Sequence, residues 1–184
     1  MSKVNLLLTR KSGFTLIELL VSITVTALLS SFVIIYSSGT RAQTALSVER
    51  AKLTQVIVRA KSLALSTYGA SAPPCGYGVH VDRSARAYEL FTYTAADCSQ
   101  IPFIDPEDAA HYRSLNRYLL PAPLAFEDGQ NVMSEVLFVP PDPKTFVWSG
   151  GALLQAGTGK IYLTTQDGAG HTSVQVSPAG QISF

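Results

Sequence analysis

Two residues, Glu107 and His111, have the types and spacing to bind a metal ion, since they are four positions apart beside Asp108. On a helix this spacing places both side chains on one face. The stretch begins with Asp105 and Pro106, which are typical of an N-cap and a first turn, and its acids suit the positive end of the helix dipole. No further histidine ligand is identifiable, so we predict a capped, solvent-facing helix over about residues 105–113 instead of a metal site.

A second stretch, Gly157-Thr158-Gly159-Lys160, has the composition of the end of a phosphate-binding loop. Such a loop also needs an earlier glycine and a final serine or threonine next to the lysine. This chain has Leu154 and Ile161 at those two positions. We therefore interpret the stretch as a turn that leads into a strand.

The remaining histidines do not belong to a recognisable catalytic set. His80 lies in a strand pattern and His171 beside a glycine-rich turn, and neither comes with a nucleophile motif such as G-x-S-x-G. Asp167 opens a stretch with the composition of a hairpin turn, and a single carboxylate is too few ligands to predict calcium. The sequence predicts no catalytic residue, no metal site and no cofactor, and we expect a protein that is not an enzyme.

The most unusual ionisable residue is Glu18, which lies within an apolar segment. Residues 14–36 contain no other ionisable side chain before Tyr36 and are long enough to cross a bilayer as a helix. A carboxylate within a membrane costs about 2–3 kcal/mol on insertion scales, and a partner cation would offset that cost. The alternative interpretation is that Glu18 only favours the helix N-terminus, where the helix dipole contributes about 0.3–1 kcal/mol.

The elements that must position these residues begin with one long helix. Cations precede the apolar run, as in an export signal, but no A-x-A cleavage site follows it. No proline occurs before Pro73, so the sequence predicts a single helix over about residues 14–68, ending near Gly69. Its second half has an apolar stripe with residues mostly three or four apart. The stripe consists of Ala42, Ala45, Leu46, Leu53, Val56, Ile57, Ala60, Leu63 and Ala64.

Beyond the helix the chain shows strand patterns separated by prolines and glycines. The expected strands, in an antiparallel meander, are residues 77–81, 87–94, 132–139, 145–148, 160–165, 172–177 and 181–184. Aromatic residues in these strands could form an adhesive or nucleic-acid stacking face, but we expect them in the core. They are Tyr88, Phe91, Tyr93 and Trp148. The predicted fold class is α+β.

Charge is divided unevenly along the chain. Residues 1–13 carry three cations and no acid, and residues 14–68 carry five cations against two acids. Residues 69–184 carry six cations against eleven acids, a net charge of −5. An acidic head of this kind is a poor non-specific ligand for nucleic acid, so we do not expect DNA or RNA as a partner.

The stretch in which a basic leader ends at Gly13 and is followed by Phe14-Thr15-Leu16-Ile17-Glu18 resembles the N-terminal motif of type IV prepilins and type II secretion pseudopilins. The resemblance implies a type IV pilin-like fold, with the long helix packed on an antiparallel sheet. It implies that a prepilin peptidase cuts between Gly13 and Phe14 and N-methylates Phe14. It also implies an assembly role for Glu18, which would attract the N-terminal amine of a neighbouring subunit.

The resemblance further implies an organisation and a location. Residues 1–13 would be a leader, residues 14–36 the transmembrane or filament-core half of the helix, residues 37–68 its amphipathic half, and residues 69–184 an exported β-rich head. The chain would cross the bacterial inner membrane once, with its N-terminus in the cytoplasm, before entering a periplasmic or extracellular filament. Its partners would be the prepilin peptidase, other pilins in a helical filament, an inner-membrane assembly platform and membrane lipid.

Export of the head would make a disulfide between Cys75 and Cys98 reasonable. The two cysteines flank the hairpin expected over residues 77–94, so antiparallel pairing could bring them together. Closing this loop could add about 3 kcal/mol by the chain-entropy estimate. Two separate free cysteines are the alternative.

Within the superfamily, the C-terminal half is most similar to GspH/FimT-type minor pilins and pseudopilins, over residues 136–140, 160–164 and 174–182. FimT-like members that bind DNA use basic residues near the C-terminus, whereas this chain has Gln181 and no lysine or arginine after Lys160. Ile35 stands where many major pilins have a kinking proline. We therefore expect a minor pilin or a pseudopilin. A DNA-uptake pilin, or a membrane-anchored exported domain with an adhesive or enzymatic role, remains the alternative.

Overall fold

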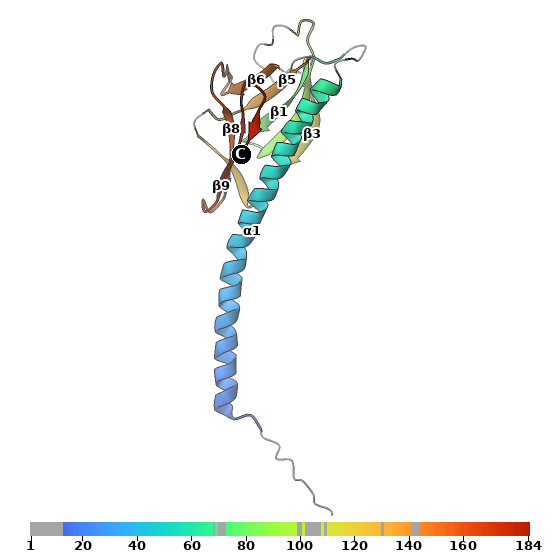
Figure 1. The fold of residues 1–184 in the computed structure, drawn as a ribbon. Helices are drawn as coiled ribbons and strands as arrows, with labels where there is room; N and C mark the ends of the chain where they lie inside the picture. The colour runs from blue at the N-terminus through green and yellow to red at the C-terminus, as the bar shows by residue number, and fades with distance from the viewer. Residues whose placement is uncertain are drawn as a thin grey trace, which may run out of the picture. The chain divides into compact units, whose positions relative to one another are not determined.

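A computed structural model provides the fold (Figure 1). It describes residues 13–67, 69, 73–98, 101, 108, 110–129, 131–140 and 144–184, except for the side chains of residues 34–40. The chain divides into two compact units, Met1–Thr40 and Arg41–Phe184. The expected leader up to residue 12 lies outside the described residues.

Helix α1 spans Leu16–Ser66 and contributes to both units. The absence of proline allows its hydrogen-bond ladder to continue without a break. After the last helical residue, the Thr67 amide and hydroxyl both donate to the Leu63 carbonyl, at 3.1 and 2.8 Å. The bounds agree with the helix predicted over about residues 14–68.

The head contains two antiparallel sheets. The first has the strand order β3-β2-β1-β5-β6-β7 and the second has the order β10-β9-β8-β4. The strands of the first sheet are β1 (Gly76–Asp82), β2 (Ala87–Tyr93), β3 (Tyr112–Leu119), β5 (Glu135–Val139), β6 (Lys144–Ser149) and β7 (Ala152–Leu153). Those of the second are β4 (Leu124–Glu127), β8 (Gly159–Thr165), β9 (His171–Val176) and β10 (Ile182–Ser183). The predicted α+β class, a long N-terminal helix with antiparallel sheet, is confirmed.

Several local predictions need correction. The strands do not form one meander, because β1 pairs with both β2 and β5 and β4 joins the second sheet. The helix expected to reach about Arg113 is wrong at its C-terminal end, where Tyr112 and Arg113 lie in β3. Tyr112 pairs with Tyr93, and its ring stacks on Phe91 with centroids 4.5 Å apart, so tertiary pairing overrides the capping signal. Residues 102–107 lie outside the described residues.

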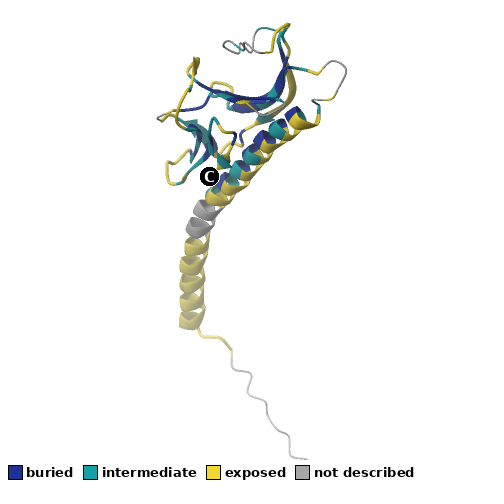
Figure 2. Ribbon diagram, turned by 45° about the horizontal axis from the view of Figure 1, so that its top comes forward, coloured by how far each residue is buried: buried dark blue, intermediate teal, exposed yellow. Residues whose placement is uncertain are grey.

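The apolar stripe of α1 packs against strands of both sheets. Leu53 and Ile57 are fully buried, in one cluster with Val136 of β5 and Ile161 of β8. Figure 2 shows the buried face of this part of α1 turned towards the sheets. Burying a leucine or isoleucine side chain contributes about 1.5–3 kcal/mol, so this stripe is a main source of the head's stability. The predicted stripe is confirmed, with Ala42, Ala45 and Leu63 partly buried.

A second apolar cluster includes the predicted core aromatics Phe91, Tyr93 and Trp148. These side chains are at most 5% exposed, and Tyr88, in the first cluster, is 1% exposed. The core assignment of the aromatic residues is confirmed. Gly78 of β1 lies between the two flanking strands, where an added Cβ would collide with the Val136 carbonyl and the Phe91 ring. Only glycine fits at this position without a shift of its neighbours.

Candidate functional site

The start of α1 is stabilised by Thr15. The backbone N–H of Glu18 donates to the Thr15 hydroxyl at 3.3 Å, and the N–H of Leu19 donates to the Thr15 carbonyl at 3.1 Å. Thr15 is therefore the N-cap, and Glu18 is the third helical residue, near the positive end of the helix dipole. The spacing of Thr15 and Glu18 matches a capping box, a signal that our sequence analysis missed.

The segment after this cap is apolar and exposed. Leu16–Val33 has a mean hydropathy of 2.1, and none of it is buried. By length and composition this segment could cross a membrane. Single large side chains are highly exposed, such as Leu16 at 84% and Phe32 at 73%. A continuous apolar surface of this extent requires lipid or protein to cover it.

The hydroxyl groups within this segment are satisfied by the helix itself. Each donates to a backbone carbonyl three or four residues earlier, at distances between 2.7 and 3.1 Å. The residues are Ser22, Thr24, Thr26, Ser30 and Ser31. Such internal bonds lower the free-energy cost of removing hydroxyls from water.

Glu18 is the exception. It is the only ionisable side chain between Leu16 and Val33, and its carboxylate forms no hydrogen bond or ion pair with the residues that the structure describes. The capping bond uses its backbone N–H, so the carboxylate is free to bind a separate cation.

The predicted cleavage position lies just before α1. Gly13 is exposed, with open space around its Cα, and the Phe14 side chain is 77% exposed. Both residues precede the first helical residue, Leu16, so the peptide bond between them lies outside the helical hydrogen-bond ladder. These residues and Glu18 belong to the first unit, whereas both cysteines belong to the second.

Cys75 and Cys98 form a disulfide in the head, with their Cα atoms 5.2 Å apart. Cys75 directly precedes β1 and Cys98 follows β2, so the bond joins the open end of the β1–β2 hairpin. Antiparallel pairing of Gly76 with Tyr93 brings the two cysteines close together. Cys75 is 3% exposed, whereas Cys98 is exposed, so the bond ties a buried residue to the surface of the head.

The head's histidines each lie beside a carboxylate. His80 Nδ1 is 3.0 Å from the buried Glu135, and His111 Nδ1 is 2.7 Å from Asp108. His171 Nδ1 is 2.8 Å from Glu127, whose hydrogen bond and charge raise the pKa of His171. Within the described part of the chain, no cluster of three or more histidine, cysteine or acidic residues could hold a metal ion. The other candidate metal ligand from the sequence, residue 107, lies outside that part.

A buried polar pair joins the helix stripe to strand β2. Glu49 is 2% exposed, and its carboxylate accepts a hydrogen bond from the Tyr88 hydroxyl at 2.8 Å. Lys52 Nζ lies 3.3 Å from the same carboxylate, and the Tyr88 ring stacks on Tyr118. Burial, followed by the hydrogen bond and charge of Glu49, raises the pKa of Tyr88 far above its usual range. The sequence signal was an acid between Leu46 and Leu53 of the apolar stripe, which our sequence analysis missed.

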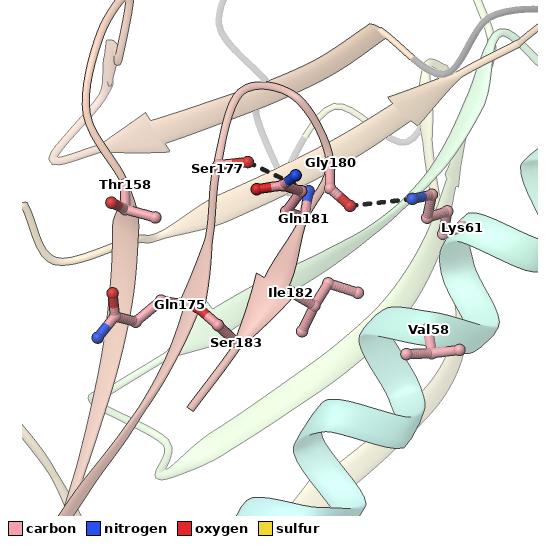
Figure 3. Close-up of a pocket in the computed structure, with 9 residues that line it drawn as sticks. All are labelled: Val58, Lys61, Thr158, Gln175, Ser177, Gly180, Gln181, Ile182 and Ser183. Carbon is pink, nitrogen blue, oxygen red and sulfur yellow. Dashed lines mark hydrogen bonds between the residues drawn. The ribbon is translucent and has the colours of Figure 1, made fainter.

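An open pocket on the head has a volume of about 740 Å³ (Figure 3). Lys61 of α1 donates from Nζ to the Gly180 carbonyl at 2.9 Å, and the Gln181 N–H donates to the Ser177 hydroxyl at 3.1 Å. The other lining residues are Val58, Thr158, Gln175, Ile182 and Ser183. This lining offers hydrogen bonds and one ammonium group but contains no carboxylate, imidazole or thiol.

Comparison with known proteins gives a match at the N-terminus. The family described as the prokaryotic N-terminal methylation motif matches residues 8–34. Residues 8–34 carry a prepilin motif. The predicted recognition of the type IV prepilin and pseudopilin superfamily is confirmed, and this segment contains Gly13, Phe14 and Glu18.

The chain is also similar to a solved structure of the minor pseudopilin EpsH from the type 2 secretion system of Vibrio cholerae. The identity is 12%, the TM-score is 0.43, and the similarity covers 75% of this chain and 94% of that chain. No curated protein sequence matches the chain.

Proposed function

We propose that the chain is a structural subunit, a minor pilin or pseudopilin, of a type IV pilus or a type II secretion-like filament. The observation that carries this proposal is the prepilin motif at residues 8–34, which coincides with the start of an exposed apolar helix. Lipid would cover this helix before assembly, and neighbouring helices would cover it in the filament. Transfer between the two environments depends on packing, because lipid tails are as apolar as the helix surface.

Processing would convert the precursor into the subunit. We infer that a prepilin peptidase cuts between Gly13 and Phe14 and methylates the new amine of Phe14. The exposure of both residues and their position before α1 support access to this bond. The cations of residues 1–13 would hold this end at the cytoplasmic face of the inner membrane, with residues 14–36 crossing the bilayer once.

Glu18 would then set the position of each incoming subunit. Its carboxylate lacks a partner among the described residues, whereas the surrounding hydroxyls are satisfied by the helix. Two opposite charges 4 Å apart attract by about 4 kcal/mol at an effective dielectric of about 20. This attraction offsets most of the cost of holding a carboxylate and an amine away from water, which is about 2–3 kcal/mol for each group. The proposed partner is the amine of Phe14 on a neighbouring subunit.

The rest of the chain would have supporting roles in the filament. Residues 37–68 would present the second half of the helix to the head, and residues 69–184 would form the exported head. The disulfide between Cys75 and Cys98 suits an oxidising compartment outside the cytoplasm. An inner-membrane assembly platform would supply the force for insertion.

The test of this function is the intact mass and N-terminal sequence of the chain from its native membrane, with and without the prepilin peptidase. We expect a mature chain that begins at N-methylated Phe14 and is present in sheared filaments. A Glu18→Gln variant separates processing from assembly. We expect it to be processed normally yet to be depleted from filaments. A chain that retains residues 1–13 beside an active peptidase would contradict the proposal.

A further inference from the structure

Arg41 is an isolated cation on α1. It is the only charged residue between Glu18 and Glu49, and its side chain is exposed. It forms no side-chain hydrogen bond or ion pair with the residues that the structure describes. Side chains three or four positions apart can meet on a helix, and none of those neighbours of Arg41 is an acid. They are Ser37, Ser38, Thr44 and Ala45. The guanidinium is therefore available to a partner outside the chain.

Along α1, Arg41 lies between the exposed apolar segment and the part of the helix that the head covers. The apolar segment reaches Val33, and none of it is buried. Among the described residues of α1, the first buried one is Leu46, which is 6% exposed and lies against Gly170 of the β8–β9 turn. Figure 2 shows this change from a fully exposed helix to one with a buried face. The head therefore leaves Arg41 uncovered.

The rise of the helix places Arg41 at the surface of a bilayer. At about 1.5 Å per residue, a hydrocarbon core of about 30 Å takes up about 20 residues, from Leu16 to Tyr36. Arg41 follows about 7–8 Å further along the helix. The headgroup layer on each side of a bilayer is about 5–8 Å thick, so Arg41 reaches this layer. The next cation, Arg50, lies about 14 Å beyond Arg41 and outside the layer.

The headgroup layer is rich in phosphate, which a guanidinium binds through two parallel charge-assisted hydrogen bonds. The nearest acid on the head side of the helix, Glu49, is 2% exposed and already bound to Tyr88 and Lys52. We propose that Arg41 binds the phosphate of a phospholipid headgroup in the periplasmic leaflet of the inner membrane. The contact would fix how far α1 enters the bilayer, and it would break when the subunit moves into a filament. This inference rests on the proposed function, which places residues 14–36 across that membrane.

The test is native mass spectrometry of the full chain in detergent, which measures bound lipid as phosphatidylglycerol is added. We expect Arg41→Gln to weaken binding about fivefold, the contribution of one cation at a membrane surface. Arg41→Lys should cause a smaller loss, because lysine keeps the charge but not the two parallel hydrogen bonds. The matched control is Arg59→Gln, which removes the same charge from an exposed position about 27 Å further along α1. It should leave binding unchanged.

Further measurements identify the phosphate and the molecule that carries it. A glycolipid with the same acyl chains but no phosphate should bind equally to the unmodified chain and to Arg41→Gln. Millimolar inorganic phosphate should not displace phosphatidylglycerol, and displacement would indicate a site for a free anion and overturn the proposal. A photo-crosslinking amino acid at position 41 should capture lipid in the native membrane. A crosslink only to protein would overturn the proposal.

Failure of this inference can be told apart from failure of the filament function. Formation of the disulfide between Cys75 and Cys98 would show that each variant folds. Equal binding by the unmodified chain and Arg41→Gln, or equal losses in Arg41→Gln and Arg59→Gln, would overturn the inference. If that chain were processed at Phe14 and present in filaments, the filament function would stand. A chain that retained its leader but bound phospholipid through Arg41 would keep the inference and lose the filament function.

Discussion

The buried pair of Glu49 and Tyr88 should show strong energetic coupling. Tyr88→Phe removes a 2.8 Å hydrogen bond to a carboxylate that is 2% exposed, and hydrogen bonds to charged groups contribute about 1.5–3 kcal/mol. We therefore expect this substitution to lower the free energy of unfolding by about 2 kcal/mol. Glu49→Leu fills a similar volume but leaves the buried Tyr88 hydroxyl without its partner, which costs about 1–3 kcal/mol.

The double variant should be far more stable than the sum of the single effects predicts. With both groups replaced by apolar ones, neither a buried carboxylate nor a hydroxyl lacks a partner, and such exchanges are often neutral or stabilising. The assay is thermal unfolding of the mature chain in detergent, monitored by near-ultraviolet circular dichroism. At this size each kcal/mol shifts Tm by about 2–4 °C. Tyr118→Phe is the control, because its hydroxyl has no bond within the described chain, and additive single effects would refute the reasoning.

Glu18→Gln keeps the backbone cap at Thr15 but removes the charge, so quantitative blotting should find it processed but depleted from sheared filaments, and equal incorporation would count against the assembly role. Replacing Cys75 and Cys98 by serine should lower the free energy of unfolding by about 3 kcal/mol, whereas equal denaturation midpoints would contradict this. Gly78→Ala should lower the free energy of unfolding by about 1–3 kcal/mol through overpacking. Gly69→Ala, where an added Cβ meets open space, should leave that free energy unchanged. Because Glu127 raises the pKa of His171, their attraction stabilises the head below pH 6.5 and is lost as pH rises through the higher folded value. His171→Asn should therefore flatten this part of the pH profile of Tm.

The sequence predicted those features that depend on neighbouring residues along the chain. The prepilin motif is a contiguous signature, and the long helix follows from apolar residues spaced by three or four without an intervening proline. Strands β1 and β2 also follow from local patterns, since each has buried residues and the turn between them is polar. A side chain's direction repeats regularly in helices and strands, so local spacing is sufficient to place these residues.

Strand β3 shows where local patterns were insufficient. Its sequence contains two arginines, a serine and an asparagine, and most of its residues are exposed. It is a strand because its backbone pairs with β2, with an irregular register after Leu90. The pairing also moves Tyr112 out of the expected helix and into a buried aromatic stack. Edge strands are exposed on several sides, so they lack the alternation that identifies a half-buried strand.

By itself, therefore, the sequence determined the prepilin N-terminus, the continuous helix with its apolar stripe, and the α+β class. Only the tertiary structure decided the division into two sheets and the burial of Glu49 under Tyr88. The partners in these features are far apart in sequence, and Glu49 and Tyr88 are 39 positions apart. Such contacts depend on how whole elements pack, because the entropy of closing the intervening loops must be overcome by many interactions at once.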